Sequence, residues 1–213
     1  MTKQKWFTGM FMLCTVALNA QVKIGVKSAY NYGSAKAVYN GVKQSAGYTS
    51  GFGIGGVVKI PFDGPLHFSP SVMINRRGFI INNPAGSTNK KEEYGITYLD
   101  LIPALSADFE KGDNAFSITA GPVFGFTNFG KLKITDNSGV TGSQKIKFGY
   151  NNYGWFDLGL NGSIAYRFNK TMIEAGYYMG LANINNNEEH DARNMQHRVA
   201  SLGIVYFFKE TAH

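Results

Sequence analysis

Eight segments of the chain alternate between apolar and polar residues with a period of two, as a β-strand does when its two faces meet different surroundings. The segment 155–168, WFDLGLNGSIAYRF, shows this well, because Phe156 and Ile164 fall on one face and Asp157 and Arg167 on the other. No segment shows a convincing helical period. The predicted strands are 22–31, 48–60, 65–77, 94–109, 115–128, 153–168, 171–183 and 197–208.

The connections between these segments alternate strictly between short and long. The short ones are 61–64 (PFDG), 110–114 (EKGDN) and 169–170. The long ones are about 32–47, 78–93, 129–152 and 184–196. Short periplasmic turns and longer outside loops are typical of a transmembrane β-barrel, and an even number of strands places both chain ends on the periplasmic side.

The contrast between the two faces indicates which one meets lipid. A soluble barrel or sandwich would turn its apolar face inward, and alternation alone leaves that alternative open. Here the polar face carries Asp100, Asp157 and Arg167 among small residues, whereas the apolar face continues for about ten positions, enough to cross a bilayer. Aromatic residues also lie at both ends of the strands, as interfacial belts do. We therefore predict an all-β fold, an eight-stranded antiparallel transmembrane β-barrel whose residues Phe156, Leu158, Leu160 and Ile164 face lipid.

Composition agrees with a turn-rich β-protein. The chain has 213 residues with 26 glycines, 14% aromatic and 16% charged residues, which does not fit a disordered chain. The formal charge is +7, and it becomes +5 without Lys3 and Lys5. This excess is mild and diffuse, so it does not indicate nucleic-acid binding.

The N-terminus has the pattern of a secretory signal peptide. Lys3 and Lys5 precede an apolar run at 6–18, and Asn19-Ala20 offers a small residue for cleavage. A membrane anchor is the alternative, but the run is shorter than the ~18–20 apolar residues that a spanning helix needs. We predict a signal peptide at 1–20, a barrel domain at 21–208 and a tail at 209–213. The single cysteine, Cys14, lies in the signal peptide, so the mature chain would hold neither a disulfide nor a zinc–thiolate site.

Five blocks in order resemble the PorT-like outer-membrane β-barrel domain family of Bacteroidota. They are YLDLIPALSADF, FSITAGPVFGF, FDLGLNGSIAYRF, MIEAGYYMGLANI and HRVASLGIVYFF. The resemblance covers nearly all of 22–208 and implies an outer-membrane barrel. The founding member is linked to type IX protein secretion, and the family's functions are mixed. The chain departs from the pattern at its end, where KETAH follows Phe208.

Two patterns could carry enzyme chemistry, and neither is distinctive. GFGIGG at 51–56 matches a dinucleotide-binding glycine motif, but the alternation continues through VVKI where that motif needs a helix. We expect Gly51, Gly53 and Gly55 to face inward, where they make room in a narrow lumen or permit strong bending of the strand. The histidines His67, His190, His197 and His213 fit no metal-binding spacing. A Ser/His or Asp/His pair stays open as a lipid- or peptide-hydrolysing alternative, while no catalytic residue, cofactor or metal is predicted.

Polar residues on the inward face predict a network in the lumen. Its members are Arg77, Asp100, Asp157, Asn161, Arg167 and Glu174. Eight strands leave an interior that side chains can fill, so we expect a plug of paired charges in preference to an open pore. The tight turn at 169–170 places Ala165 opposite Glu174, and we therefore predict a contact between Arg167 and its diagonal neighbour Glu174.

The outside loops are rich in lysine. The predicted basic loop residues are Lys36, Lys43, Lys131, Lys133, Lys145 and Lys147. They could meet outer-membrane lipid, including lipopolysaccharide, or an envelope protein, and simple solvation is the alternative. The sequence favours a non-enzymatic barrel that acts in interaction or structural support, with a secretion (type IX-like) or envelope complex as its setting. A narrow channel for small solutes and an outer-membrane hydrolase are the other hypotheses.

Overall fold

The computed structural model describes residues 22–187 and 192–210. The predicted signal peptide at 1–20 and residues 211–213 of the predicted tail lie outside these described residues. So does 188–191, a part of the fourth long connection. Within the described part of the chain, no helix is long and apolar enough to cross a membrane.

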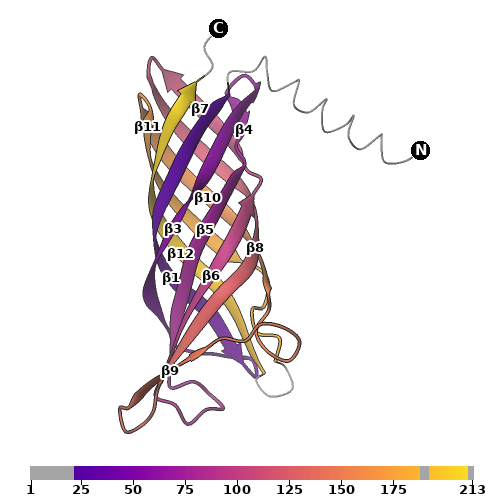
Figure 1. Cartoon of the computed structure of the whole chain (residues 1–213). Coiled ribbons are helices and arrows are strands. Elements are labelled where there is room, and N and C mark those ends of the chain that lie inside the picture. The colour runs from indigo at the N-terminus through magenta and orange to yellow at the C-terminus, as the bar shows by residue number, and fades with distance from the viewer. Residues whose placement is uncertain (1–21, 188–191, 211–213) are drawn as a thin grey trace, which may run out of the picture.

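The described chain forms one closed antiparallel sheet, drawn as a single cylinder in Figure 1. Its strands are β1 Lys23–Tyr39, β2 Val42–Lys43, β3 Ala46–Asp63, β4 Leu66–Phe68, β5 Ser71–Asn82, β6 Lys91–Ile102, β7 Leu105–Lys111, β8 Asn114–Thr135, β9 Thr141–Lys145, β10 Phe156–Phe168, β11 Thr171–Gly180 and β12 Arg193–Glu210. The first and last strands pair along their whole length and close the ring. Strands β2 and β9 are short additions at one end, paired with β1 and β8.

The barrel wall consists of eight strands, two of which are each interrupted and therefore carry two labels. Strands β4 and β5 are separated at Pro70, and β6 and β7 at Pro103, but each pair continues along the same neighbours. Proline has no N–H to give to the ladder, so it interrupts a strand inside a closed sheet. Pro70 accepts a hydrogen bond from the Val58 amide at 3.0 Å and cannot return one. The predicted eight-stranded antiparallel barrel is confirmed.

The three predicted short turns are confirmed, and all lie at one end of the barrel. Gly64, Gly112 and Asn169 have positive φ in these turns, of 52°, 60° and 54°. Glycine adopts this conformation without steric cost, and asparagine tolerates it better than most residues. The start of β1 and the end of β12 lie at the same end (Figure 1). This is the periplasmic end of an outer-membrane barrel, and the opposite end is extracellular.

The connections predicted at 32–47 and 78–93 are much shorter than predicted, whereas those predicted at 129–152 and 184–196 are only slightly shorter. β1 continues to Tyr39, β5 to Asn82 and β8 to Thr135, and β12 begins at Arg193. The barrel wall therefore extends beyond the predicted strands into the extracellular space. The prediction was wrong here because it searched for strands with an apolar outer face, and the extensions have the reverse pattern.

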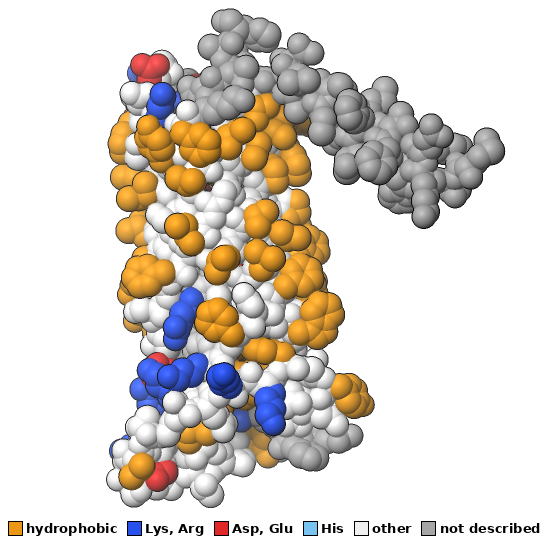
Figure 2. All heavy atoms as spheres, in the orientation of Figure 1, with side chains coloured by type: hydrophobic (Ala, Val, Ile, Leu, Met, Phe, Trp, Pro, Cys, Tyr) orange, Lys and Arg blue, Asp and Glu red, His pale blue; other side chains and the backbone are white. Residues whose placement is uncertain are grey.

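Strand β5 shows this reversal within twelve residues. Through the membrane, Val72 and Ile74 point outward and are about half exposed, while the inward Arg77 is buried. Farther out, the inward residues are Phe79 and Ile81, both fully buried. In Figure 2 the apolar side chains accordingly cover the wall on the periplasmic side, and lysine and arginine side chains gather toward the β9 end. The apolar residues therefore point outward where the wall crosses lipid and inward where it lies in water.

Gly51, Gly53 and Gly55 of GFGIGG lie on β3 and face the lumen. A methyl group on Gly51 would collide with the Arg76 carbonyl oxygen, and one on Gly55 with the Val72 carbonyl oxygen. Both collisions are with the neighbouring β5 strand, so the glycines allow the inner wall to bend tightly. The expectation that they make room inside the barrel is confirmed.

The assigned lipid face can be tested at Leu160, which points outward near the middle of β10 and is 46% exposed. Leu160→Arg should lower the free energy of unfolding in lipid vesicles by about 2–4 kcal/mol, because a charge near the bilayer midplane is costly. Gln196→Arg, on the outward face of the β12 extension, is the control and should change it by less than about 1 kcal/mol. Equal effects at the two positions would contradict the assigned membrane boundary.

Candidate functional site

The centre of the lumen is built around one buried arginine. Arg77 comes from β5, Asp100 from the neighbouring β6, and Asp157 from β10, so the wall brings distant segments together. Arg77 Nη1 donates to Asp157 Oδ2 at 2.8 Å, and Arg77 Nη2 donates to Asp100 Oδ2. Arg77 is 3% exposed and both carboxylates are fully buried. A buried cation bonded to two carboxylates requires the closely matched geometry seen here.

Two tyrosines enclose the guanidinium. Its carbon lies 4.7 Å from the ring centre of Tyr98 and 4.0 Å from that of Tyr178, within cation–π range. The Tyr178 hydroxyl also donates to Asp157 Oδ2 at 2.7 Å. The sequence pattern identified neither ring as a partner of Arg77. Each ring comes from a different strand of the wall, so the sequence carries no local signal for this arrangement.

Glycine makes space for this cluster. A methyl group on Gly125 of β8 would lie 3.0 Å from Asp100 Oδ1 and 3.5 Å from Arg77 Nη1. Oδ1 of Asp100 and Oδ1 of Asp157 are buried and accept no hydrogen bond within the described chain. The cluster is therefore held on one side of each carboxylate only, and Asn75 Nδ2 adds a bond of 2.7 Å to Asp100 Oδ2.

Nearer the periplasm, the lumen is crossed by three further ion pairs. Lys27 donates to Glu174, and Lys59 lies 2.7 Å from both carboxylate oxygens of Asp108. Arg167 Nη2 donates to Glu110 Oε1 at 2.9 Å, and its Nη1 donates to the carbonyl oxygens of Asp113 and Asn169. The charges on the inward face are thus paired across the lumen.

The predicted contact between Arg167 and Glu174 is wrong. Ala165 does oppose Glu174, as expected. However, Arg167 turns toward the periplasmic turn and pairs with Glu110, while Glu174 pairs with Lys27 of β1. The Lys27–Glu174 pair passes over the intervening β12, which a rule for adjacent strands does not consider.

Asn161 of the predicted network borders the space that remains in the lumen. It is partly buried and lines two small cavities in the lumen, of about 40 and 30 Å³. Lys27 and Glu174 line both cavities as well. These volumes admit only a few water molecules. The lumen is therefore filled by side chains at this level.

At the extracellular end, apolar side chains fill the lumen. We call these residues the outer plug: Phe79, Ile81, Tyr94, Ile96, Leu132, Ile146, Ile184 and Met195. Phe79 and Tyr94 stack with ring centres 4.6 Å apart. The loop residue Tyr153 packs against the plug, with its ring centre 5.8 Å from that of Tyr94. Tyr94 and Ile96 fall in the predicted strand 94–109, but the other six plug residues fall in the predicted long connections, so the prediction missed most of the plug.

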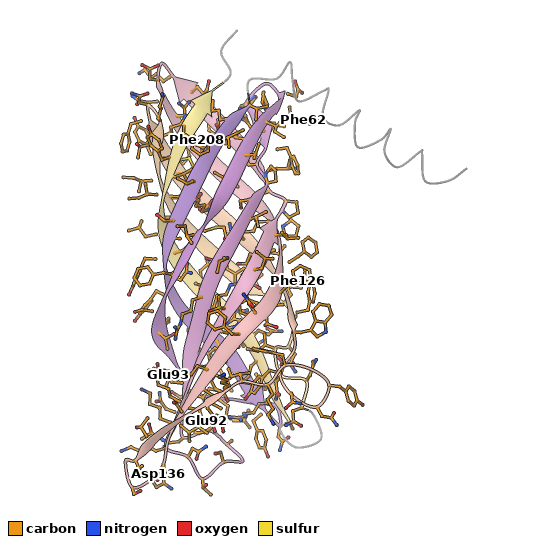
Figure 3. All side chains as sticks on the ribbon, in the orientation of Figure 1. Phe62, Glu92, Glu93, Phe126, Asp136 and Phe208 are labelled. Carbon is orange, nitrogen blue, oxygen red and sulfur yellow. The ribbon has the colours of Figure 1, made fainter. Side chains whose placement is uncertain are left out.

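One buried ion pair borders the outer plug. Glu92 accepts hydrogen bonds from Arg193 Nη1 at 2.7 Å and from the Tyr94 hydroxyl at 2.7 Å. Asn89 Nδ2 adds a third bond at 2.8 Å. Burial raises the pKa of Glu92, but these hydrogen bonds and the charge of Arg193 outweigh it, so the pKa lies below its ordinary value. Glu92 and its half-buried neighbour Glu93 lie at the extracellular end, labelled in Figure 3.

The histidines in the described chain do not form a catalytic arrangement. His67 is opposite Ser106, but the Ser106 hydroxyl bonds to Ser69 at 2.7 Å. His67 Nδ1 lies 3.0 Å from the Pro65 carbonyl oxygen and 3.9 Å from Asp108. His197 is fully buried beside the Tyr98 hydroxyl. Across the described ranges, no three His, Cys, Asp or Glu side chains are grouped so as to hold a metal ion.

The six predicted basic loop residues are all exposed on the extracellular half. They are Lys36, Lys43, Lys131, Lys133, Lys145 and Lys147. Lys133 lies 3.0 Å from Glu93. The structure places five of them on strand extensions and β-hairpins and Lys147 in an irregular loop. Side chains on such strands have defined outward directions, so their spacing is set by the sheet.

Arg77 and its two carboxylates can be tested as a unit. Arg77→Met should lower the free energy of unfolding by about 3–5 kcal/mol, because it leaves Asp100 and Asp157 buried without their cation. Adding Asp100→Asn and Asp157→Asn to this variant should restore part of the loss. Urea unfolding in vesicles measures both changes. A triple variant less stable than the single one would contradict the electrostatic explanation.

Glu92 predicts a specific response to acid. Because folding lowers its pKa, its stabilisation is fully present above about pH 5 and is lost as the pH falls through the folded-state pKa. Wild type should therefore lose more unfolding free energy between pH 6 and pH 3 than Glu92→Gln does. Urea titrations at the two pH values measure the difference. Parallel losses in the two proteins would exclude Glu92 as a contributor.

Comparison with known proteins agrees with this architecture. A family model described as "Outer membrane protein beta-barrel domain" matches residues 18–186. Among solved structures, Ail of Yersinia pestis, determined with the heparin analogue sucrose octasulfate, is 14% identical. The match covers 88% of this chain and 99% of Ail, with a TM-score of 0.45. Neisserial surface protein A is 13% identical over 87% of this chain and 97% of that one, with a TM-score of 0.44. No curated protein matches the chain.

Proposed function

The chain belongs to the family of outer membrane proteins with a β-barrel domain, and we propose that it is a non-enzymatic, non-conducting member that acts by contact. Its role would be interaction or structural support in the cell envelope. The observation that carries this proposal is the filled lumen. The outer plug and the Arg77 cluster follow one another along the barrel, and cavities of only about 40 and 30 Å³ lie beside them.

The order of these layers argues against the alternative of a solute channel. An ion that entered from outside would first meet Phe79, Tyr94 and Met195, which are at most 1% exposed. It would then meet Arg77, whose partners Asp100 and Asp157 are already engaged. Opening a path requires breaking a buried ion pair, which costs several kcal/mol. A hydrolase is also disfavoured, because Ser106 and His67 have other hydrogen-bond partners.

Contact would take place mainly at the extracellular end. The exposed lysines gather there, below the apolar band of Figure 2, and they favour anionic partners. Outer-membrane lipid, including lipopolysaccharide, is one such partner class, and an envelope protein is the other. Nucleic acid is not expected, since the barrel holds its basic side chains at a membrane interface.

A finer assignment rests on the five sequence blocks. We infer a PorT-like barrel of Bacteroidota, exported by a cleavable signal peptide at 1–20. A place in a type IX-like secretion complex is the corresponding form of the interaction role. The domain limits of 21–208, with a tail at 209–213, belong to the same proposal, although β12 continues to Glu210.

Two measurements test this function. The protein purified from its native outer membrane in mild detergent should give no stable conductance steps in planar bilayers, because the lumen is filled. Mass spectrometry of the same preparation should identify a stoichiometric lipid or protein partner. Stable conductance would overturn the non-conducting assignment, and a monomer free of any partner would contradict the interaction role.

A further inference from the structure

A groove lies on the outer wall at the extracellular end, where β5, β6, β8 and β9 meet. Its volume is about 680 Å³, which is within the range of small-molecule sites. Three cations line it: Arg76 of β5, Lys131 of β8 and Lys145 of β9. Phe129 and Phe148 provide apolar surface beside them. We call this the basic groove.

The cations of the basic groove are not neutralised by the protein. Lys131 and Lys145 are direct cross-strand partners, and like charges in that position destabilise a sheet. Within the described chain, Arg76, Lys131 and Lys145 form no ion pair, and no acidic residue lines the groove. An anion that bound there would remove this repulsion.

The next position along the same strands shows the contrast. There Lys133 of β8 is 3.0 Å from Glu93 of its partner strand β6. Opposite Lys131, the equivalent residue of β6 is Gly95, which carries no charge. Lys133 therefore has a carboxylate opposite it on β6, whereas Lys131, two residues away on β8, has no side chain opposite it.

Arg76 occupies part of that space. A methyl group on Gly95 would lie 2.8 Å from Arg76 Nη2, so the guanidinium lies across the glycine and toward the strand that carries Lys131. The missing side chain at 95 thus has two effects. It removes a possible acid, and it lets the arginine approach the two lysines.

The depth of the groove indicates its occupant. On β8, Phe129 is 60% exposed at the outer edge of the apolar band, and Lys131 follows two residues later. Two strand residues span about 7 Å, which carries the cation from the hydrocarbon boundary into the headgroup layer. An anion held there with an apolar side toward Phe129 is part of an amphipathic molecule.

We infer that the basic groove binds the phosphate groups of an outer-leaflet glycolipid, the lipid A part of lipopolysaccharide. Arg76 would hold a phosphate through its paired N–H donors, and Lys131 and Lys145 would add charge. The sugar would lie against Phe129, and the acyl chains would continue along the lipid face toward Leu99 and Phe126. This assignment rests on the proposed contact function and names its partner.

The test is titration of the full mature protein in detergent with phosphorylated lipid A, followed by native mass spectrometry. Arg76→Gln/Lys131→Gln/Lys145→Gln should raise the dissociation constant at least about tenfold, since three cations contribute. Lys133→Gln is the matched control and should change it less than about twofold, because Glu93 already engages Lys133. Dephosphorylated lipid A should bind wild type as weakly as phosphorylated lipid A binds the triple variant.

Other outcomes would overturn the inference. Equal affinity of wild type and triple variant would exclude the basic groove as the site. Displacement of lipid A by an equal concentration of inorganic phosphate would assign the groove to a free anion. Heat-dependent gel mobility shows that the triple variant is folded, as expected for exposed side chains. Either failure leaves the conductance test of the filled lumen unaffected, so the two proposals can fail separately.

Discussion

The whole structure depends on one constraint: each strand keeps its period of two while its surroundings change from lipid to water. In the bilayer the outward residues must be apolar, because lipid offers no partner for polar groups. Beyond it the outward residues meet water, and the inward ones can form an ordinary core. Strand β5 contains both arrangements. Val72 and Ile74 point outward within the membrane, and Phe79 and Ile81 point into the lumen beyond the membrane. The charged layer around Arg77 lies at this exchange.

The sequence was sufficient for the membrane part and insufficient beyond it. Segment 155–168 carries its own evidence, because Phe156 and Asp157 can have opposite surroundings only in a half-buried strand. The strand extensions were not predicted, because residues such as Phe79 were assigned to loops. Inward and outward residues nevertheless alternate there as regularly as in the membrane part. In the lumen, pairing of Arg77 with Asp100 is local to adjacent strands, whereas Asp157 and Tyr178 reach Arg77 across the barrel. Only closure of the ring determines such contacts, as the incorrect Arg167–Glu174 pair also shows.

A filled interior changes what the protein can offer to other molecules. A porin presents its lumen, but here the lumen is occupied by the outer plug and by ion pairs that satisfy one another. The remaining chemistry is on the outer wall, where Lys131 and Lys145 face each other without an acid between them. The inner charges hold the barrel together, and the outer charges are left for a partner. Each set has a separate role because the wall separates them completely.

The interruptions at Pro70 and Pro103 weaken the hydrogen-bond ladder at one place in the barrel wall. Antiparallel neighbours in a hydrogen-bonded pair normally exchange two bonds, but Pro70 returns none to Val58. A second proline, Pro103, ends the neighbouring strand β6 at nearly the same height, since the Ser69 amide reaches the Ala104 carbonyl beside it. A sheet resists shear through its ladder, so the missing hydrogen bonds make the wall softer at this patch. We expect lateral pressure in a crowded membrane to deform the wall there before it reaches the Arg77 layer.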